Sequence, residues 1–406
     1  MGGLKQEVED VYAASGRTRY CYSSKDKQQE RAMAMGAEED GGRLEMGELI
    51  PGLPDDVAME CLARVPSRSH RRMRRVCRGW RGAVGSPEFR WRRRAAGAAE
   101  DVVFLVQTAP PAGGDGKGST PPECALAAAN LTTGEWRRVK GPVPLFAQCA
   151  AAGDGRHVAV VGGWDPDTLR PTSDVRVLDV PAGTWRRGRP MPDSRSFFGC
   201  SGGGGGDGCV YVAGGHDVSK NALRSAFAYA VAADAWRALP GMAEERDEPQ
   251  LVAAHGGGVI AASGYPTEAQ GAFKRTAERY VGAAAGGGAW TDEGDFVPDA
   301  AETCLASVRG NVWAVGAGRG GVREWDGAAR AWREVADGPP GVEKCVKAVG
   351  VGEGAAVFVF GTVADGAAEG SKYSAWVMEA GGDPWKRVPV PSGFGGFVYS
   401  AAAVLI

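Results

Sequence analysis

The sequence predicts an all-β, six-bladed propeller preceded by a small α-helical domain. The first observation behind this fold class is a spacing. Six tryptophans recur at intervals of 42 to 54 residues, at Trp136, Trp185, Trp236, Trp290, Trp332 and Trp385. The second observation is that short apolar runs, typical of strands, precede each tryptophan and are bounded by glycine-rich segments. The third is a stretch before the first strand in which apolar residues recur at helical spacing.

A tryptophan period near 50 residues is typical of kelch-type propeller blades, in which each repeat is one small sheet. The final apolar run, FVYSAAAVLI, has no tryptophan repeat of its own. We expect it to pair with the first blade, because a closed ring leaves no strand edge open to aggregation. Residues 100–406 are therefore expected to form the propeller, with about six blades.

Glycines and tryptophans have structural roles in this interpretation. Double glycines follow apolar runs at Gly162-Gly163 and Gly214-Gly215. Glycine accepts positive φ, so we expect the chain to turn there, where the sheets crowd the central channel. The repeated tryptophans are expected to fill the gaps between adjacent blades.

The chain before the propeller divides into two regions. Residues 1–45 are polar and charged and lack a helical or strand period, so we expect a disordered extension. Residues 46–95 are expected to form two or three short helices. A core made by so few residues is thin, and it is expected to be completed by a partner or by the propeller.

Proline and apolar residues define the expected helices. Pro54 suits the first turn of a helix, the acidic pair that follows it complements the helix dipole, and Pro66 ends this helix. A second apolar stripe at helical spacing comprises Met73, Val76, Cys77, Trp80 and Val84. Pro87 and Phe89 are expected to end the unit.

Composition limits the classes of function. The net charge is -2, yet the segment 62–94 holds 12 Arg and one Glu. Such a basic block is compatible with nucleic acid binding, but we expect a solvated helix face and no nucleic acid partner. No apolar run is long enough to span a membrane, the N-terminal residues are polar, and the nine cysteines show no metal or CxxC spacing. We therefore expect a cytoplasmic and/or nuclear protein without membrane partner, metal or cofactor.

Two patterns that could indicate chemistry are rejected. Gly316, Gly318 and Gly321 match GxGxxG, but a strand-like run follows where a dinucleotide site needs a helix. A carboxylate cluster at 244–248 could carry acid–base catalysis. We interpret it instead as an acidic loop on the propeller rim, so no catalytic residue is predicted.

The helical region 46–95 resembles an F-box. The resemblance rests on Leu53-Pro54, the following Asp55 and Asp56, Leu62, Val65-Pro66, Val76-Cys77, Trp80 and Phe89. The segment SRSHRRM departs from it, because F-boxes usually carry hydrophobic residues there. An F-box implies docking onto the Skp-type adaptor of a cullin–RING ubiquitin ligase. The adaptor contacts that the resemblance implies are Leu53, Pro54, Val57, Leu62, Val65 and Pro66.

Three longer segments are similar to one subfamily of plant F-box/kelch-repeat proteins. They read MGELIPGLPDDVAMECLARVP, EERDEPQLVAAHGG and SGYPTEAQGAFKRTAERYV. Members of that subfamily are receptors for phenylalanine ammonia-lyase, chalcone synthase or type-B response regulators of cytokinin signalling.

The resemblance implies a non-catalytic substrate-recognition subunit of an SCF-type ligase, which directs a target to ubiquitination and proteasomal degradation. Phenylalanine ammonia-lyase or another phenylpropanoid enzyme is the expected target, and a type-B response regulator is an alternative. A kelch scaffold without a ubiquitin role also remains open. Deletion of residues 1–95 would separate these classes from a propeller enzyme.

Target contacts are expected in the loops that border the strands, where propellers commonly bind their partners. The candidates are Arg195, Phe197, Arg246, Asp247, Tyr265, Gln270 and Lys344. For Arg246 and Asp247, a structural salt bridge between blades is the alternative.

Overall fold

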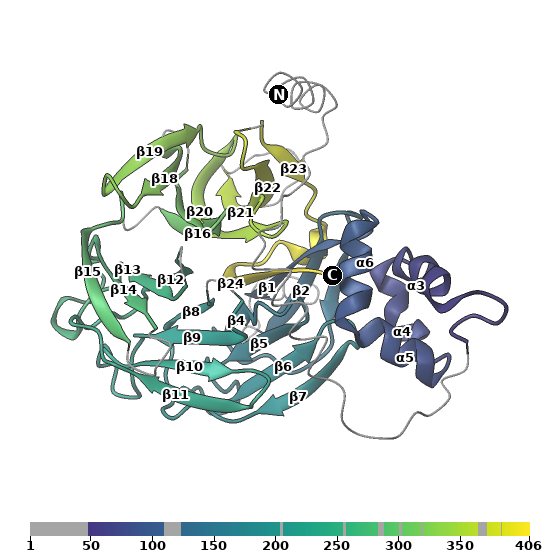
Figure 1. The fold of residues 1–406 in the computed structure, drawn as a ribbon. Helices are drawn as coiled ribbons and strands as arrows, with labels where there is room; N and C mark the ends of the chain where they lie inside the picture. Colours follow the sequence, from purple (N-terminus) through teal and green to yellow (C-terminus); the bar gives the residue numbers. More distant parts are fainter. Residues whose placement is uncertain are drawn as a thin grey trace, which may run out of the picture. The chain divides into compact units, whose positions relative to one another are not determined.

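The computed structural model describes residues 48–108, 123–203, 206–254, 257–282, 288–299, 303–317, 320–363, 372–382 and 384–406. The expected extension at 1–45 and Gly318 of the GxGxxG match lie outside these residues. The described chain forms a small helical domain followed by a six-bladed β-propeller, which confirms the predicted fold class (Figure 1). In this part of the chain, no helix has the length and apolar character needed to span a membrane.

The helical domain contains five short segments. They are α3 (Asp55–Ala63), η1 (Ser67–Ser69), α4 (His70–Met73), α5 (Arg78–Gly85) and α6 (Pro87–Ala95). Pro54 is the N-cap of α3, and Asp55 and Asp56 occupy its first turn, where negative charge favours a helix N-terminus. The buried side chains of Met59, Leu62, Met73, Val84 and Phe89 form its core.

Two helix predictions were wrong. The stripe from Met73 to Val84 is not one helix, because α4 ends at Met73 and the extended residue Cys77 caps α5, its sulfur accepting a hydrogen bond from the Trp80 amide. Pro87 does not end the unit. It is the first residue of α6, where its missing N–H costs nothing, and Ser86 caps this helix through the Phe89 amide.

Each blade is a four-stranded antiparallel sheet. Blade 1 contains β24 (Val398–Leu405), β1 (Asp101–Thr108), β2 (Cys124–Asn130) and β3 (Trp136–Val139). Blade 2 contains β4 (Gln148–Ala151), β5 (His157–Val161), β6 (Val175–Asp179) and β7 (Thr184–Gly188). Blade 3 contains β8 (Gly199–Gly202), β9 (Cys209–Ala213), β10 (Ala226–Ala230) and β11 (Ala235–Leu239).

The other three blades repeat this order. Blade 4 contains β12 (Gln250–Ala253), β13 (Val259–Ala262), β14 (Thr276–Val281) and β15 (Ala289–Asp295). Blade 5 contains β16 (Cys304–Val308), β17 (Asn311–Val315), β18 (Val322–Asp326) and β19 (Ala331–Ala336). Blade 6 contains β20 (Val342–Val351), β21 (Ala356–Val363), β22 (Tyr373–Glu379) and β23 (Lys386–Val388). Short 3-10 turns occur at η2 (Thr267–Ala269) and η4 (Ser392–Phe394).

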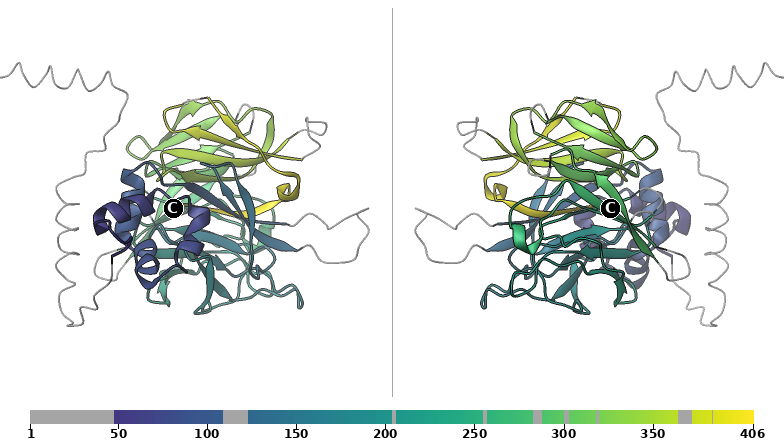
Figure 2. Two further views of the ribbon diagram at one scale, coloured as in Figure 1. Left: turned by 90° about the vertical axis from the view of Figure 1, so that its right-hand side faces the viewer. Right: turned by 90° about the vertical axis from the view of Figure 1, so that its left-hand side faces the viewer.

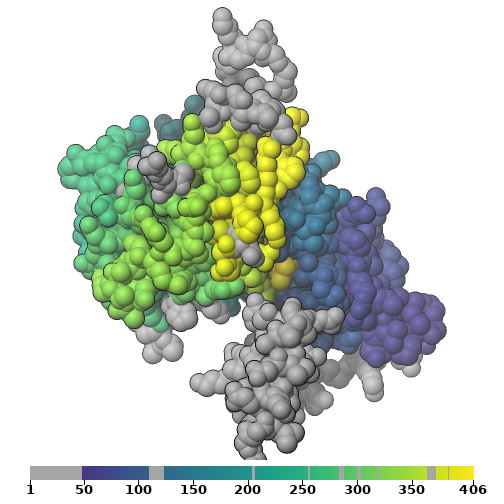
Figure 3. Space-filling view, turned by 90° about the horizontal axis from the view of Figure 1, so that it is seen from above, coloured from purple at the N-terminus to yellow at the C-terminus, as the bar shows by residue number. Residues whose placement is uncertain are grey.

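The ring is closed by pairing β24 with β1, so that Val103 lies opposite Ala403. Figure 3 shows this C-terminal chain between blade 6 and blade 1. The innermost strands β24, β4, β8, β12, β16 and β20 line the central channel, which holds a cavity of about 240 Å³. Several consist of small residues, such as QCAA in β4 and GCSG in β8, whose low strand propensity makes them hard to find in the sequence.

The repeated tryptophans join neighbouring blades by hydrogen bonds. In five of them the indole Nε1 donates to the carbonyl of the first residue after the outer strand of the preceding blade, over 2.5–2.9 Å. These pairs are Trp185 to Lys140, Trp236 to Arg189, Trp290 to Pro240, Trp332 to Phe296 and Trp385 to Asp337. In the first blade, the ring of Trp136 instead packs against Phe394 at 5.3 Å. The tryptophan period is therefore a period of inter-blade contacts.

The double glycines have positive φ, at +57° and +92° for Gly162 and Gly163 and at +65° and +81° for Gly214 and Gly215. A Cβ atom on Gly163 would collide with the carbonyl oxygen of Leu145, which comes from the segment entering the inner strand. Glycine is needed here for its backbone angle and for the close approach of two chain segments.

One buried ion pair joins the helical domain to the ring. The guanidinium of Arg93 in α6 lies 3.1 Å from the Glu100 carboxylate, and it donates to the carbonyls of Ala63 and Val65 at 2.7 and 2.6 Å and of Ile406 at 3.2 Å. Burial alone would raise the pKa of Glu100, but hydrogen bonds from Ser67 and its other partners hold that pKa below its usual value.

We expect the substitution Arg93→Met to lower the free energy of unfolding by about 3 kcal/mol or more, because it leaves Glu100 buried without its cation. Denaturant unfolding followed by circular dichroism measures this loss. The matched control is Arg94→Met, since Arg94 pairs with Glu353 on the surface and is expected to contribute less than about 1 kcal/mol. Equal losses in the two variants would contradict the role assigned to Arg93.

His70 makes the helical domain sensitive to acid. Burial, together with the positive charge of Arg93, lowers the pKa of His70 from 6.5 to about 4, and its Nε2 lies 3.1 Å from the Val65 carbonyl oxygen. Between pH 6.5 and pH 4 the unfolded chain binds the extra proton more readily than the folded one. The free energy of unfolding should therefore fall as the pH is lowered through this window, by up to about 3 kcal/mol.

The variant His70→Gln tests this dependence, because glutamine can still donate to Val65 but does not titrate. We expect its free energy of unfolding to decrease less steeply than that of the unmodified chain between pH 6.5 and pH 4, in denaturant titrations at matched ionic strength. The same slope in both proteins would show that other groups cause the loss.

Candidate binding surfaces

The helical domain contacts one end of the propeller strands and leaves the other end free. Because neighbouring strands in a blade run in opposite directions, the turn between the first and second strands and the turn between the third and fourth strands lie at the same end. The β20–β21 turn of blade 6 is of the first kind, and the β2–β3 turn of blade 1 is of the second kind. Arg68 and Arg94 of the helical domain pair with Glu135 and Glu353 in these turns, at 2.8 and 2.6 Å. The opposite end, here called the loop face, carries the connections between the second and third strands and between successive blades (Figure 2).

The helix α3 has an uncovered apolar side. Pro54, Val57 and Cys61, at spacing i, i+3 and i+7, share one exposed side, while Leu62 points into the helical core. Val57 is 44% exposed, and Val76 in the turn after α4 is 61% exposed. Apolar side chains this accessible in a domain with a thin core are typical of a surface that a partner covers.

The predicted adaptor contacts divide by burial. Pro54, Val57 and Pro66 are exposed, and Leu53 and Val65 are half-buried, so all five stay predicted contacts. Leu62 must be corrected, since its side chain belongs to the helical core and is not available to a partner of the folded domain.

The predicted target contacts Arg195 and Arg246 also need correction. Arg195 is fully buried and donates to the carbonyls of Gly214 and Ser225, both at 3.0 Å. Arg246 occupies the corresponding position one blade later and bonds to Ser263 at 2.8 Å and to the Glu278 carboxylate at 3.2 Å. Arg246 lies in the connection between blades 3 and 4, so its ion pair joins this connection to Glu278 in β14 of blade 4.

Asp247 completes a buried chain of hydrogen bonds across two blades. Ser196 Oγ lies 2.8 Å from His216 Nε2, and His216 Nδ1 lies 2.8 Å from Asp247 Oδ2. This is the connectivity of a Ser-His-carboxylate triad. However, Ser196 is 0% exposed and its Oγ cannot reach a substrate, so the chain is a structural link between blades 3 and 4. Asp247 is therefore corrected from target contact to inter-blade contact.

The carboxylate cluster is likewise occupied by partners inside the fold. Glu244 pairs with Lys274 at 2.9 Å and with Arg246 at 3.0 Å, and Glu248 accepts a hydrogen bond from the Tyr265 hydroxyl at 3.0 Å. Tyr265 itself is buried and is therefore corrected from target contact to a residue that holds the fold together.

Phe197, Gln270 and Lys344 remain accessible on the loop face. Phe197 is half-buried, whereas Gln270 and Lys344 are exposed. They belong to the segments entering or within blades 3, 4 and 6, so the structure does not gather them into one small site. These three stay predicted target contacts.

An aromatic cluster that the sequence did not reveal surrounds Phe197. Its ring stacks on Phe146 at 5.3 Å, and Phe146 makes edge contacts with Trp164 at 5.5 Å and with Tyr399 at 5.0 Å. The Nε1 of Trp164 is buried without a partner in the described chain. One signal was available: Trp164, His216 and Tyr265 each follow the glycine pair, or its Ser-Gly equivalent, of their blade.

Comparisons with known proteins agree with this architecture. A model of the F-box domain matches residues 50–92, and a model of the Kelch motif matches residues 146–192 and 199–243. The first match runs from before α3 into α6, and the other two cover all four strands of blade 2 and of blade 3.

The chain is also similar to two proteins of Arabidopsis thaliana. It is 42% identical over 270 residues to F-box/kelch-repeat protein SKIP20, which covers 58% of this chain and 64% of that protein. It is 38% identical over 264 residues to F-box/kelch-repeat protein At1g80440, which covers 63% of this chain and 72% of that protein. The aligned part thus spans about two thirds of these relatives.

The solved structure of YjhT has the same ring at the level of the fold. Its TM-score is 0.50 at 11% sequence identity, and the match covers 70% of this chain and 97% of that chain.

We expect Ser196 to behave as a structural residue. A fluorophosphonate probe should leave the intact protein unlabelled, and Ser196→Ala should lower the free energy of unfolding by about 1 kcal/mol through loss of one buried hydrogen bond. Mass spectrometry after probe treatment and denaturant unfolding measure the two effects. Labelling that disappears in Ser196→Ala would instead identify a nucleophile.

Proposed function

Because the chain belongs to the F-box/kelch-repeat protein family, we propose that it is the substrate-recognition subunit of an SCF-type cullin–RING ubiquitin ligase. The observation that carries the proposal is the separation of two accessible surfaces. The apolar side of α3 belongs to the helical domain, and the loop face with its aromatic cluster lies at the opposite end of the strands.

In this proposal the helical domain binds a Skp-type adaptor, and through it a cullin. Burial of Pro54 and Val57 in the adaptor would remove from water the apolar surface that the thin helical core leaves exposed. The loop face holds the target protein. The chain contributes no catalytic residue, and its effect is to raise the local concentration of target lysines near the ubiquitin carrier.

The rim of the aromatic cluster is the proposed centre of target binding. Phe146 and Phe197 are half-buried aromatic rings, a residue type enriched at the centres of protein interfaces, and the exposed Gln270 and Lys344 would add polar contacts. The proposed target is phenylalanine ammonia-lyase or another phenylpropanoid enzyme. A type-B response regulator is the second candidate. Support for both comes from the resemblance of segments 244–257 and 263–281 to receptors of these proteins.

We propose a cytoplasmic and/or nuclear location for this complex. The cysteines in the described part of the chain are all free thiols, as is usual for reducing compartments.

The substitution Val57→Asp is expected to reduce retention of the adaptor at least tenfold, because it places a charge in an apolar interface without touching the helical core. Val76→Asp tests the second exposed side chain. The matched control is Val218→Asp, since Val218 is 67% exposed on the loop face and should not contact the adaptor. Pull-down of purified adaptor measures retention. Failure of the unmodified chain to retain the adaptor would favour the non-ubiquitin scaffold. Unchanged retention in Val57→Asp and Val76→Asp would show that the adaptor does not bind this side of the helical domain.

Target identity is tested in cells with the proteasome blocked. We expect full-length protein to co-purify phenylalanine ammonia-lyase, and Phe197→Ala together with Phe146→Ala to reduce this capture while adaptor binding persists. A chain lacking residues 46–95 should still capture the target under this block. In cells with an active proteasome, that chain should no longer lower the level of the target, whereas the full-length chain should. Capture of a type-B response regulator instead would replace the target and leave the receptor role intact.

A further inference from the structure

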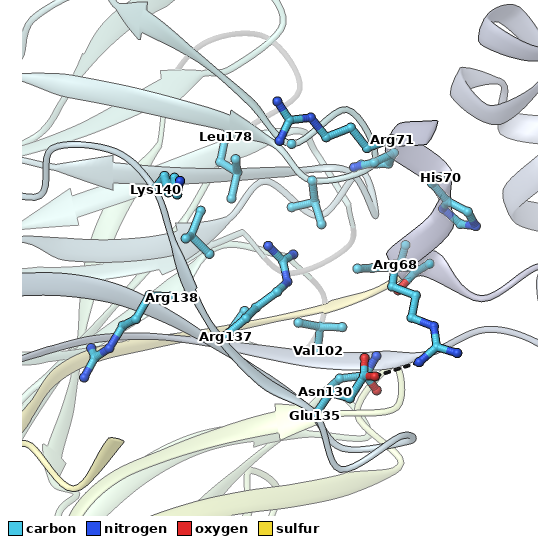
Figure 4. A pocket seen from close by; sticks show the side chains of 17 residues that line it. Arg68, His70, Arg71, Val102, Asn130, Glu135, Arg137, Arg138, Lys140 and Leu178 are labelled. Atoms are coloured by element: carbon cyan, nitrogen blue, oxygen red, sulfur yellow. Dashed lines mark hydrogen bonds and ion pairs between the residues drawn. The ribbon is translucent and has the colours of Figure 1, made fainter. Parts of the chain in front are cut away.

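A basic pocket lies where the helical domain meets blades 1 and 2. Its volume is about 350 Å³, within the range of small-molecule sites. Figure 4 shows Arg71 entering from the helical domain and Arg137 from the propeller, while Arg68 turns aside to Glu135. The origin of this concentration of positive charge can be traced by comparing equivalent positions in neighbouring blades.

In two junctions, the arginine that follows the repeat tryptophan bonds to the next blade, whereas Arg333 after Trp332 pairs with Glu324 of its own blade. Arg186, after Trp185, donates to the Asp234 carboxylate at 3.3 Å and to the Tyr229 hydroxyl at 3.4 Å. Arg237, after Trp236, donates to the Tyr280 hydroxyl at 3.3 Å. In these two junctions the protein itself supplies the oxygen atoms that the guanidinium requires.

Arg137, after Trp136, is the equivalent arginine of the first junction, and its partners are missing. Tyr229, which accepts from Arg186, lies opposite Trp236 in blade 3. The residue opposite the equivalent Trp185 in blade 2 is Leu178, whose side chain has no hydroxyl to accept from Arg137. Asp234, whose carboxylate also accepts from Arg186, lies two residues before Trp236. The equivalent position two residues before Trp185 is Gly183, so no carboxylate is present there for Arg137. Among the described residues, no side-chain hydrogen bond or ion pair of Arg137 is found.

Further cations face the same space. A Cβ atom on Gly183 would lie 3.7 Å from Cδ of Arg71, which places this second arginine over the position of the missing carboxylate. Lys140 also lines the pocket, and within the described chain neither it nor Arg71 has an anionic partner. Arg68 pairs with Glu135, whose negative charge also acts on Arg137, and His70 is neutral at pH 7. Arg138 lines the pocket too, with its guanidinium over the Phe394 ring. The cations that line the pocket therefore outnumber its one side-chain carboxylate.

We propose that this pocket binds a small soluble polyphosphate anion, held between Arg71 and Arg137 in place of the missing carboxylate. Phosphate oxygens match the planar fork of a guanidinium, and a ligand with two phosphate groups carries enough charge to neutralise the site. Because Arg71 belongs to the helical domain and Arg137 to the propeller, the bound anion would stabilise the contact between the helical domain and the propeller. This site is independent of adaptor and target binding.

The test uses the full-length chain with pyrophosphate as the probe, in isothermal titration calorimetry and thermal unfolding. Sodium chloride at the same ionic strength is the salt control, and orthophosphate tests whether one phosphate group is enough. We expect binding of one pyrophosphate per chain and a higher midpoint of unfolding. Arg137→Gln and Arg71→Gln should each weaken binding about tenfold or more. Arg75→Gln is the matched control, since Arg75 is exposed on the same domain and does not line the pocket.

Gly183→Asp gives a second test that does not remove a cation. Asp234 adopts φ of +50° at the equivalent position and Gly183 has φ of +63°, so an aspartate can be accommodated. This variant should be more stable than the unmodified chain without pyrophosphate and should no longer respond to it. The proposal is overturned if pyrophosphate has no effect beyond that of sodium chloride, or if Gly183→Asp and Arg137→Gln respond as the unmodified chain does.

Discussion

The buried pairing of Arg93 with Glu100 is the contact on which the arrangement of the described chain depends. A charge removed from water must be matched by an opposite charge and by hydrogen bonds, and both residues meet this requirement with groups from separate parts of the chain. Arg93 binds the end of α3 and the carbonyl of Ile406, while Glu100 binds Ser67 and Asn130. The helical domain, blade 1 and the closing strand thus share one polar centre.

The ring could be predicted because its most regular inter-blade contact is made by a tryptophan, which recurs at a regular spacing in the sequence. Five of the six repeated indoles donate to a carbonyl at a fixed place in the preceding blade, so the tryptophans recur with the blades. The inner strands have no such repeated residue. They lie close together around the central channel and consist mainly of small residues, so the alternation of apolar and polar residues that predicts a strand is absent from them. The break at Cys77 was also missed, because it depends on one extended residue inside an otherwise helical stripe.

The candidate contact residues lie in or beside the loops and the helix that the sequence predicted, but burial decides which of their side chains a partner could reach. Arg195 and Arg246 lie in loops and donate their hydrogen bonds to backbone carbonyls of the fold. Leu62 lies in the first helix but on its inner side. The contacts among Phe146, Phe197 and Tyr399 join residues from three blades, and no local pattern reports such a meeting.

The pairing of Asp101 with Leu405 has a consequence for biosynthesis. About 300 residues separate the two strands that complete blade 1, so β1 leaves the ribosome long before its inner neighbour exists. The hydrogen bond from Arg93 to the carbonyl of Ile406 can likewise form only after Ile406 has been synthesised. Blades 2 to 5 can form during translation. Blade 1 and the contact of Arg93 with Ile406 can be completed only after the last strand of the ring has left the ribosome. A prematurely terminated chain would therefore lack the Ile406 carbonyl as a partner of Arg93 and the inner strand of blade 1.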